Sequence, residues 1–220
     1  MNPSADALVL RGPAVVDQWF QRARHALVLA LGVLGCLVLA GVCEQSSANL
    51  RVPDAATLAR HWQQGDVIVL VRHAERCDRS SAPCLGAADG ITVRGSQMAS
   101  RLGQEYRTLD LSHTDIYASP ATRTAQTASQ MFGSIAQDQA WAGDCAKDLL
   151  ANLAHHKRAG HNLVLVTHSE CMQRLQDSLT GLDVDTPDYG ASLVVYTDEL
   201  QGLQVAGQID NDDWPPLAVR

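Results

Sequence analysis

Two short apolar runs, each followed by a histidine, dominate the hydrophobic pattern of the chain. The first is Val67–Arg72 before His73, and the second is residues 163–167 before His168. Continuous runs rich in β-branched residues are typical of strands buried on both faces of an open α/β sheet. Such sheets bind ligands beyond the carboxyl ends of their strands. Both histidines are therefore predicted to lie at one ligand-binding edge.

Helical and strand patterns alternate along the rest of the chain. Asp54 and Thr92 are predicted N-caps, and Gly202 lies in the turn of a predicted hairpin. Residues 77–91 have the Ser, Gly, Pro and Asp content of a loop, which we expect to border the pocket. Helices are predicted over residues 54–64, 92–109, 121–132, 144–158 and 170–179, and strands over residues 113–118, 192–196 and 204–209.

A third strand end leads into the segment SPATRTAQTA at residues 119–128, which begins a helix and carries Arg123. Arg72 ends the first strand. Two arginines and two histidines at one edge indicate a pocket for a phosphoryl group, because guanidinium groups make bidentate contacts with phosphoryl oxygens. One histidine at a strand end is usually a polar residue without a catalytic role. The matched positions of all four side chains favour a site over coincidence.

Three of these segments carry a resemblance to a known family. RHAE at residues 72–75, SPATRTAQTA and THS at residues 167–169 resemble the histidine phosphatase superfamily, which has the phosphoglycerate-mutase-like fold. RHAERCDRS, the pair Cys84-Leu85 and GITVRG at residues 90–95 are similar to the periplasmic lipopolysaccharide core heptose(II)-phosphate phosphatases. The likeness covers residues 57–196. It implies a single three-layer α/β domain with a mostly parallel central sheet flanked by helices.

The resemblance also implies a role for each of the four side chains. His73 matches the nucleophile, which attacks as a neutral imidazole and becomes a phosphohistidine. Arg72 and Arg123 match the arginines that hold the phosphate, and His168 matches the histidine that donates to a phosphoryl oxygen. No metal ion and no cofactor are implied. Ala74 departs from the superfamily, in which glycine usually follows the nucleophile, and its methyl group narrows the approach to the pocket.

The leaving oxygen needs a proton, and the sequence leaves its source open. Asp148 is the first choice, because members of the subfamily carry a carboxylate at a matching offset from a similar cysteine. Asp144 is the second choice and Glu75 the third. A proton donor elsewhere and a substrate-assisted step stay open. Arg76 is predicted either to contact the substrate phosphate or to form an ion pair with a loop carboxylate.

The N-terminal part of the chain carries a predicted membrane signal. Residues 26–43 form an uncharged apolar run near the lower length limit for a membrane-spanning helix. Arg22 and Arg24 precede the run, which favours a cytoplasmic N-terminus and an exported remainder. The run is predicted to be an uncleaved anchor in the inner membrane, a signal cleaved after Ala48, or a lipidated segment. The resulting divisions are a cytoplasmic segment (1–25), the helix (26–43), a linker (44–53) and the phosphatase domain (54–220).

Cysteine usage agrees with export. Two of the six cysteines, Cys36 and Cys43, lie in the apolar run, and an even set of four remains in the domain. Such a set in an exported domain suggests two disulfides with three alternative connectivities. We favour Cys77 with Cys84 and Cys145 with Cys171. The absence of a CxxC spacing in the sequence argues against a zinc site.

Charge and composition restrict the partners. The net charge is −7, and the only lysines are Lys147 and Lys157. A nucleic-acid-binding protein needs a broad basic face, so nucleic acid is excluded as a partner. A small phosphorylated substrate is predicted instead. Four further histidines are interpreted as surface or capping residues: His113, His155, His156 and His161.

The leading hypothesis is an exported phosphomonoesterase that acts on a phosphorylated sugar of the cell envelope. The resemblance implies the lipopolysaccharide core as substrate. A broad-specificity acid phosphatase and a phosphohistidine phosphatase are the enzymatic alternatives. A catalytically silent envelope protein that binds phosphorylated ligands is the alternative from another class.

Overall fold

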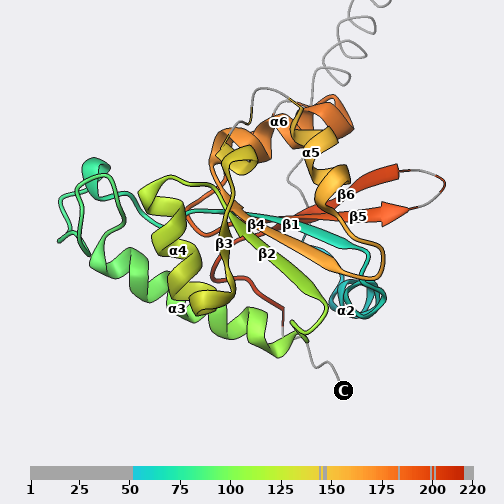
Figure 1. Ribbon diagram of the computed structural model, residues 1–220, viewed down its shortest axis with the longest axis horizontal. Helices are drawn as coiled ribbons and strands as arrows, with labels where there is room; N and C mark the ends of the chain where they lie inside the picture. The colour runs from blue at the N-terminus through green and yellow to red at the C-terminus, as the bar shows by residue number, and fades with distance from the viewer. Residues whose placement is uncertain are drawn as a thin grey trace, which may run out of the picture. The chain divides into compact units, whose positions relative to one another are not determined.

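The computed structural model describes residues 52–215, except residues 144, 146, 147, 183, 199 and 201. Its centre is a six-stranded sheet with helices on both faces (Figure 1). The segments predicted at 1–25 and 26–43, and the linker up to residue 51, lie outside the described residues. Among the residues that are described, no helix is long and apolar enough to cross a membrane.

The elements follow the predicted alternation closely. The strands are β1 (Val67–Arg72), β2 (Thr114–Ala118), β3 (Gln137–Asp138), β4 (Asn162–Thr167), β5 (Ser192–Asp198) and β6 (Gly202–Ile209). The α-helices are α2 (Ala55–Gln64), α3 (Val93–Thr108), α4 (Thr122–Phe132), α5 (Leu149–His156) and α6 (Ser169–Thr180). Short 3₁₀ turns occupy Cys77–Arg79, Gly133–Ile135 and Ala140–Gly143. Both predicted N-caps are confirmed, since the Thr57 amide donates to Asp54 and the Gly95 amide to Thr92, each at 2.9 Å.

The sheet is mixed, with the order β3-β2-β4-β1-β5-β6. The pairs β1–β4, β2–β4 and β2–β3 are parallel, whereas β1–β5 and β5–β6 are antiparallel. The predicted hairpin is therefore confirmed as β5 and β6, and it extends the parallel part of the sheet on one side. β1 and β4 lie at the centre, buried on both faces as their apolar runs predicted.

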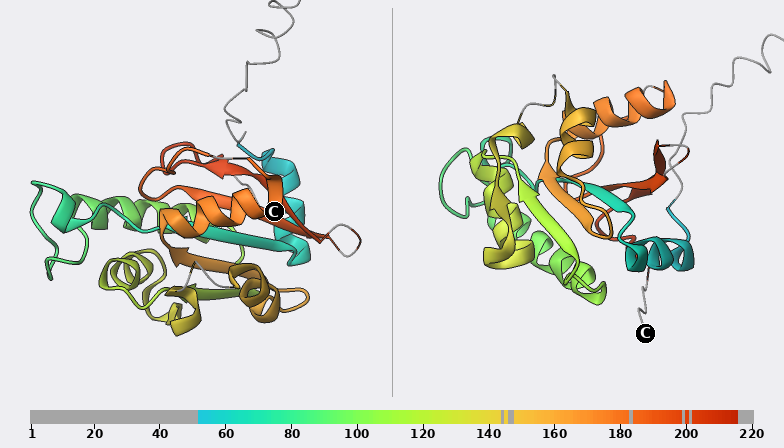
Figure 2. Two further views of the ribbon diagram at one scale, coloured as in Figure 1. Left: turned by 90° about the horizontal axis from the view of Figure 1, so that it is seen from above. Right: turned by 45° about the vertical axis from the view of Figure 1, so that its right-hand side comes forward.

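Alternate side chains of the central strands serve two separate cores. Val67, Val69 and Val71 of β1 pack with residues of α2, α3 and α4 on one face. Ile68 and Leu70 pack with residues of α5 and α6 on the other face. Figure 2 shows the same division, with α5 and α6 on one side of the sheet and α2 and α3 on the other. The three predicted layers are thus confirmed.

Two details differ from the sequence-based prediction. The helix predicted from residue 144 begins only at Leu149, because Asp148 has φ 57° and a residue in the left-handed region cannot continue a right-handed helix. The strand β3 was not predicted. It is only two residues long and almost wholly exposed, so it carries no apolar pattern.

Both favoured disulfides are present. Cys77 pairs with Cys84 at a Cα–Cα distance of 5.2 Å, and Cys145 pairs with Cys171 at 4.8 Å. The first closes the loop after β1, and the second joins the segment before α5 to the first part of α6. Each disulfide therefore fixes a segment that follows one of the strand-end histidines.

The contact between α3 and α4 depends on the absence of a side chain at Gly103. A Cβ atom there would lie 2.7 Å from the Met131 Cα atom, and also too close to the Met131 carbonyl group. We expect Gly103→Ala to lower the free energy of unfolding by about 1–3 kcal/mol, measured by urea denaturation. Gly86→Ala is the matched control, since its nearest new neighbour is the Gln126 side chain at an ordinary 3.5 Å. Equal stability of the two variants would contradict this interpretation.

Candidate active site

The carboxyl ends of β1, β4 and β2 meet at one edge of the sheet. His73 follows β1, and its amide donates to the Thr167 carbonyl at the end of β4 (2.9 Å). Ser119 follows β2, and its amide donates to the Val166 carbonyl (3.0 Å). The backbone therefore brings His73, His168 and Ser119 side by side, as expected for the ligand-binding edge of an open sheet.

Arg123, in the first turn of α4, lies between the two histidines. Its Nε is 3.3 Å from His73 Nε2, and its Nη2 is 3.3 Å from His168 Nδ1. The two imidazole rings have their centroids 5.4 Å apart. One guanidinium group thus contacts both histidines through two different nitrogen atoms. This is the fork geometry that also suits a phosphoryl group.

The hydrogen bonds of His73 assign its tautomer. Nδ1 lies 2.8 Å from the Ala74 carbonyl oxygen, which can only accept, so Nδ1 carries the hydrogen in the neutral ring. Nε2 then presents its lone pair toward Arg123. Burial lowers the pKa of His73 to about 3, and the positive charges of Arg123 and Arg72 act in the same direction. The ring is neutral at physiological pH and has the free nitrogen that a nucleophile needs.

His168 has the complementary arrangement. Nδ1 accepts from Arg123, so Nε2 carries the hydrogen and donates to Ser119 Oγ (3.1 Å). The pKa of His168 is lowered to about 4, mainly by burial and also by the positive charge of Arg123, while Glu170 opposes the shift. The serine of the SPATR segment is thus a hydrogen-bond partner of the second histidine.

Arg72 supplies the second guanidinium group. Nη1 donates to the Pro187 carbonyl, and the guanidinium carbon lies 4.1 Å from the centre of the Tyr189 ring, a cation–π contact. Burial lowers the pKa of Arg72. Within the described residues, its Nε is buried without a hydrogen-bond partner. A buried donor of this kind fits an anionic ligand, because an unpaired buried donor is costly.

Thr127 of α4 joins the two sides of this cluster. Its hydroxyl accepts from the Ala74 amide (3.0 Å) and donates to the Arg123 carbonyl (2.7 Å). The side chain is fully buried. It therefore connects the backbone that binds His73 Nδ1 to the helix that carries Arg123.

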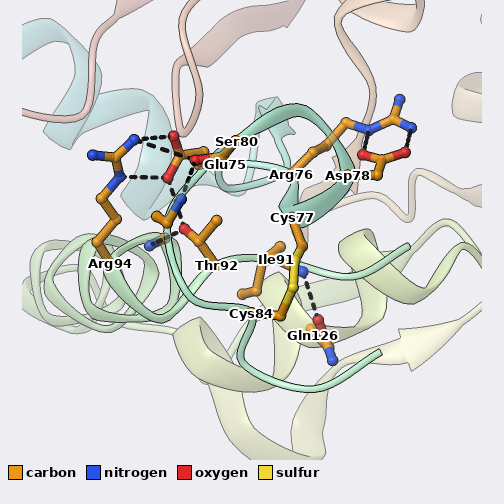
Figure 3. The surroundings of a disulfide bond; sticks show 12 residues. Glu75, Arg76, Cys77, Asp78, Ser80, Cys84, Ile91, Thr92, Arg94 and Gln126 are labelled. Atoms are coloured by element: carbon orange, nitrogen blue, oxygen red, sulfur yellow. Dashed lines mark hydrogen bonds and ion pairs between the residues drawn. A yellow bond between two sulfur atoms is a disulfide. The ribbon is translucent and has the colours of Figure 1, made fainter. Parts of the chain in front are cut away.

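The loop after His73 is held in place by several contacts. In Figure 3 the Cys77–Cys84 disulfide lies beside Ile91, whose amide donates to Gln126 of α4 (2.8 Å). Arg76 forms an ion pair with Asp78, with its Nε 2.8 Å from Asp78 Oδ1. Of the two alternatives for Arg76, the unliganded protein thus shows the ion pair with a loop carboxylate.

The three carboxyl candidates for proton transfer lie apart from one another. Glu75 is bound by Arg94 and by the Thr92 hydroxyl (2.7 Å), and the hydrogen bonds from Arg94 lower its pKa to about 2 (Figure 3). Asp148 is exposed and lines a depression with Cys145, Leu149 and the α6 residues Arg174 and Ser178. Asp144 lies outside the described residues. In the described part of the chain no hydrogen bond or ion pair joins Asp148 to His73 or His168, so its role stays a prediction.

Several residues at the site were missed by sequence reasoning. Ser119, Tyr189 and Glu170 contact or interact electrostatically with the predicted side chains, and Thr127 bonds to the backbone of Ala74 and Arg123. Ser119 and Thr127 lay within the SPATRTAQTA segment, so the motif could have indicated them. Glu170 follows His168 closely, whereas nothing near Tyr189 in the sequence pointed to the site. Of the histidines interpreted as surface or capping residues, His161 contacts Asp115 at the amino end of β2, away from the site.

Comparison with known proteins defines the class. The histidine phosphatase superfamily (branch 1) matches residues 68–140, which include His73 and Arg123. The fold resembles the protein histidine phosphatase SixA complexed with tungstate, with a TM-score of 0.52 and 13% identity over 68% of this chain and 99% of that one. A phosphoglycerate mutase from Bacillus anthracis has a TM-score of 0.51 and 13% identity over 68% and 96% of the two chains. The fold and motifs are those of a histidine phosphatase.

Curated relatives give a closer placement. A lipopolysaccharide core heptose(II)-phosphate phosphatase from Salmonella typhi is 34% identical over 188 residues, 82% of this chain and 90% of that protein. The protein of the same name from Salmonella arizonae is 34% identical over 167 residues, 73% and 82% of the two chains. The chain belongs to the histidine phosphatase superfamily and is an enzyme of the phosphoric monoester hydrolase class.

Replacing the Thr127 hydroxyl tests its positioning role. Thr127→Val would leave the buried Ala74 amide and the Arg123 carbonyl without this partner. We expect the free energy of unfolding to fall by about 1–3 kcal/mol and kcat to fall with it, because His73 and Arg123 lose their common support. Thr127→Ser keeps the hydroxyl and should retain most of the stability and most of kcat. Stability and activity as high in Thr127→Val as in Thr127→Ser would contradict the positioning role of the hydroxyl.

The low pKa of His73 predicts an acid-dependent loss of stability. Below pH 6.5 the unfolded chain protonates this ring, whereas the folded site stays neutral down to about pH 3. Stability due to this difference is therefore present above pH 6.5 and lost as the pH falls toward 3. The free energy of unfolding of wild type and of His73→Gln should be measured by urea denaturation at several pH values. Plotted against pH, the two curves should differ in slope by up to about 1.4 kcal/mol per pH unit below pH 6 and run parallel from pH 7 to 8. Parallel curves at acid pH would disprove the buried neutral state.

Proposed function

We propose that the protein is an exported phosphomonoesterase that works through a phosphohistidine intermediate on His73. The observation that carries the proposal is the single guanidinium group of Arg123, which contacts the free Nε2 of His73 and also His168. A neutral nucleophile beside fixed cations is what attack on an anionic phosphoryl group requires. Arg72, with its unpaired buried Nε, adds the second cation.

The first half of the reaction is displacement of the alcohol by His73. A bond forms between Nε2 and phosphorus while the bond from phosphorus to the leaving oxygen breaks, and the leaving oxygen takes a proton. Arg72 and Arg123 bind the equatorial oxygens, where negative charge accumulates. His168, once the phosphoryl charge favours its protonated form, donates to one of these oxygens. The Ala74 carbonyl holds the Nδ1 proton and stabilises the cationic ring that forms.

The second half returns the enzyme to its resting state. Water attacks phosphorus opposite His73, the phosphorus–nitrogen bond breaks, and phosphate leaves with His73 neutral again. The two arginines supply the charge stabilisation that metal ions supply in other phosphoryl-transfer enzymes. The proposed scheme therefore requires no metal ion and no cofactor.

The proposed substrate is a phosphorylated sugar of the cell envelope, the lipopolysaccharide core being the first choice. Support comes from the curated relatives named for this activity and from the RHAERCDRS and GITVRG segments. Export to the periplasm is supported by the two disulfides, which persist in oxidising compartments, and by the apolar run at 26–43. Retention of that run as an inner-membrane anchor, its cleavage and its lipidation remain the three proposed outcomes.

Phosphate release by the purified, oxidised full chain tests the proposal. We expect turnover of 4-nitrophenyl phosphate in the presence of a chelator, and a higher kcat/KM with lipopolysaccharide carrying a phosphorylated core. His73→Ala should lose roughly 10³-fold or more of both activities, as removal of a nucleophile does. His113→Ala, at an exposed histidine outside the site, is the matched control.

The outcomes separate the alternatives. Turnover without preference for the lipopolysaccharide core would favour a broad-specificity phosphatase, and preference for a phosphohistidine protein would favour a protein phosphatase. Binding of phosphorylated ligands without turnover by the folded protein would favour a silent envelope protein. Full activity of His73→Ala would contradict the proposed nucleophile.

A further inference from the structure

Glu170 is placed at the site by the turn that follows β4. His168 is the N-cap of α6, and its carbonyl accepts from the amides of Cys171 (3.1 Å) and Met172 (3.3 Å). Glu170 lies in this first turn, and the Cys145–Cys171 disulfide secures the neighbouring residue. The position of its backbone is therefore fixed relative to the second histidine, while its side chain is exposed to solvent.

Glu170 is also the carboxyl group with electrostatic interactions across the whole cluster. It interacts with both histidines, His73 and His168. It interacts as well with the arginines of the site, Arg72, Arg76 and Arg123. Three other described carboxylates, Asp78, Asp89 and Asp188, each interact with at least one of these arginines, whereas Glu170 interacts with all three and with the histidines.

The other polar groups of the cluster are not available to protonate a leaving alcohol. His73 forms the bond to phosphorus, and its remaining proton is bound by the Ala74 carbonyl. His168 donates its Nε2 proton to Ser119 in the unliganded site, and in the proposed reaction it donates to a phosphoryl oxygen and not to the leaving oxygen. Arginine does not release a proton in proteins. A carboxyl group is the usual acid for such a leaving oxygen, and Glu75 is already bound by Arg94 and Thr92.

We propose that Glu170 is the catalytic acid and base of this phosphatase, an inference that rests on the phosphohistidine mechanism proposed above. In the first half, the Glu170 carboxyl group transfers its proton to the leaving oxygen as the phosphorus–oxygen bond breaks. In the second half, the resulting carboxylate takes a proton from the attacking water as the phosphorus–nitrogen bond breaks. Each cycle consumes one water molecule, releases an alcohol and phosphate, and returns Glu170 to its protonated state.

The charge state of Glu170 fits this cycle. In the unliganded protein a hydrogen bond from its own backbone amide lowers its pKa, and the histidines contribute to the same direction. A bound phosphoryl dianion is a like charge beside the carboxylate, which raises the carboxyl pKa and favours the protonated form. Substrate binding therefore supplies the acid, and loss of the alcohol leaves the base in place for water.

Glu170→Gln keeps the shape of the side chain and removes its proton, and two leaving groups reveal the consequence. With a sugar phosphate, whose alkoxide needs a proton, we expect kcat to fall roughly 10²–10⁴-fold. With 4-nitrophenyl phosphate, whose phenolate leaves unassisted, the variant should release a burst of nitrophenolate equal to the enzyme concentration. Slow steady-state turnover should follow, because water attack has lost its base. Asp177→Asn, an exposed acid later in α6, is the control for a charge change on the same helix.

Several results would overturn the proposal. Unchanged turnover by Glu170→Gln would do so. Equal losses of kcat on the sugar phosphate and on 4-nitrophenyl phosphate, without a burst, would indicate only a positioning role and would also overturn it. A loss that depends on the leaving group in Asp148→Asn, but not in Glu170→Gln, would assign the acid to Asp148. Failure of the phosphohistidine mechanism itself is distinct, because wild type would then show no turnover or His73→Ala would stay active.

Discussion

The contact of Arg123 with both histidines is the interaction on which the proposed mechanism depends. Parallel pairing of β1 with β4 places Arg72 opposite Thr167, and this register brings His73 beside His168. A shift of the register by one residue would turn one histidine toward the other face of the sheet. The apolar runs of both strands, each divided between two cores, prevent such a shift. The hydrophobic pattern that forms the sheet therefore also aligns the two histidines of the candidate site.

Burial and charge have different effects on the histidines and the arginines of this cluster. Low solvent exposure keeps both rings neutral, which leaves a lone pair on His73 Nε2, while the arginines keep their charge because their intrinsic pKa is so high. The site thus combines a neutral imidazole, the proposed nucleophile, with cations suited to a phosphoryl group. Both disulfides border it, since Cys77 follows the first histidine and Cys171 the second. The loop from Cys77 to Thr92 projects beyond the sheet in Figures 1 and 2.

Features with a local cause could be predicted from the sequence. The central strands, the capped helices α2 and α3 and the β5–β6 hairpin follow from periodicity and cap residues, and the structure has them all. The even cysteine count predicted two disulfides, and the structure has the pairing favoured among the three possible ones. Features that depend on tertiary contacts could not be predicted. The Thr127 hydroxyl matters only because α4 packs beside Ala74, and the ion pair of Arg76 depends on how the loop folds back. The late start of α5 reflects the left-handed backbone at Asp148, which has no signal in an aspartate alone.

The central claim is that His73 attacks through Nε2 because Nδ1 is held by the Ala74 carbonyl. The most direct measurement is to quench the enzyme at alkaline pH during turnover and locate the phosphoryl group by peptide mass spectrometry and ³¹P NMR. The account predicts one acid-labile phosphate per molecule, on Nε2 of His73, that disappears at the rate of turnover. Phosphate on another residue or on Nδ1, or no phosphoenzyme from a protein that turns over rapidly, would contradict it.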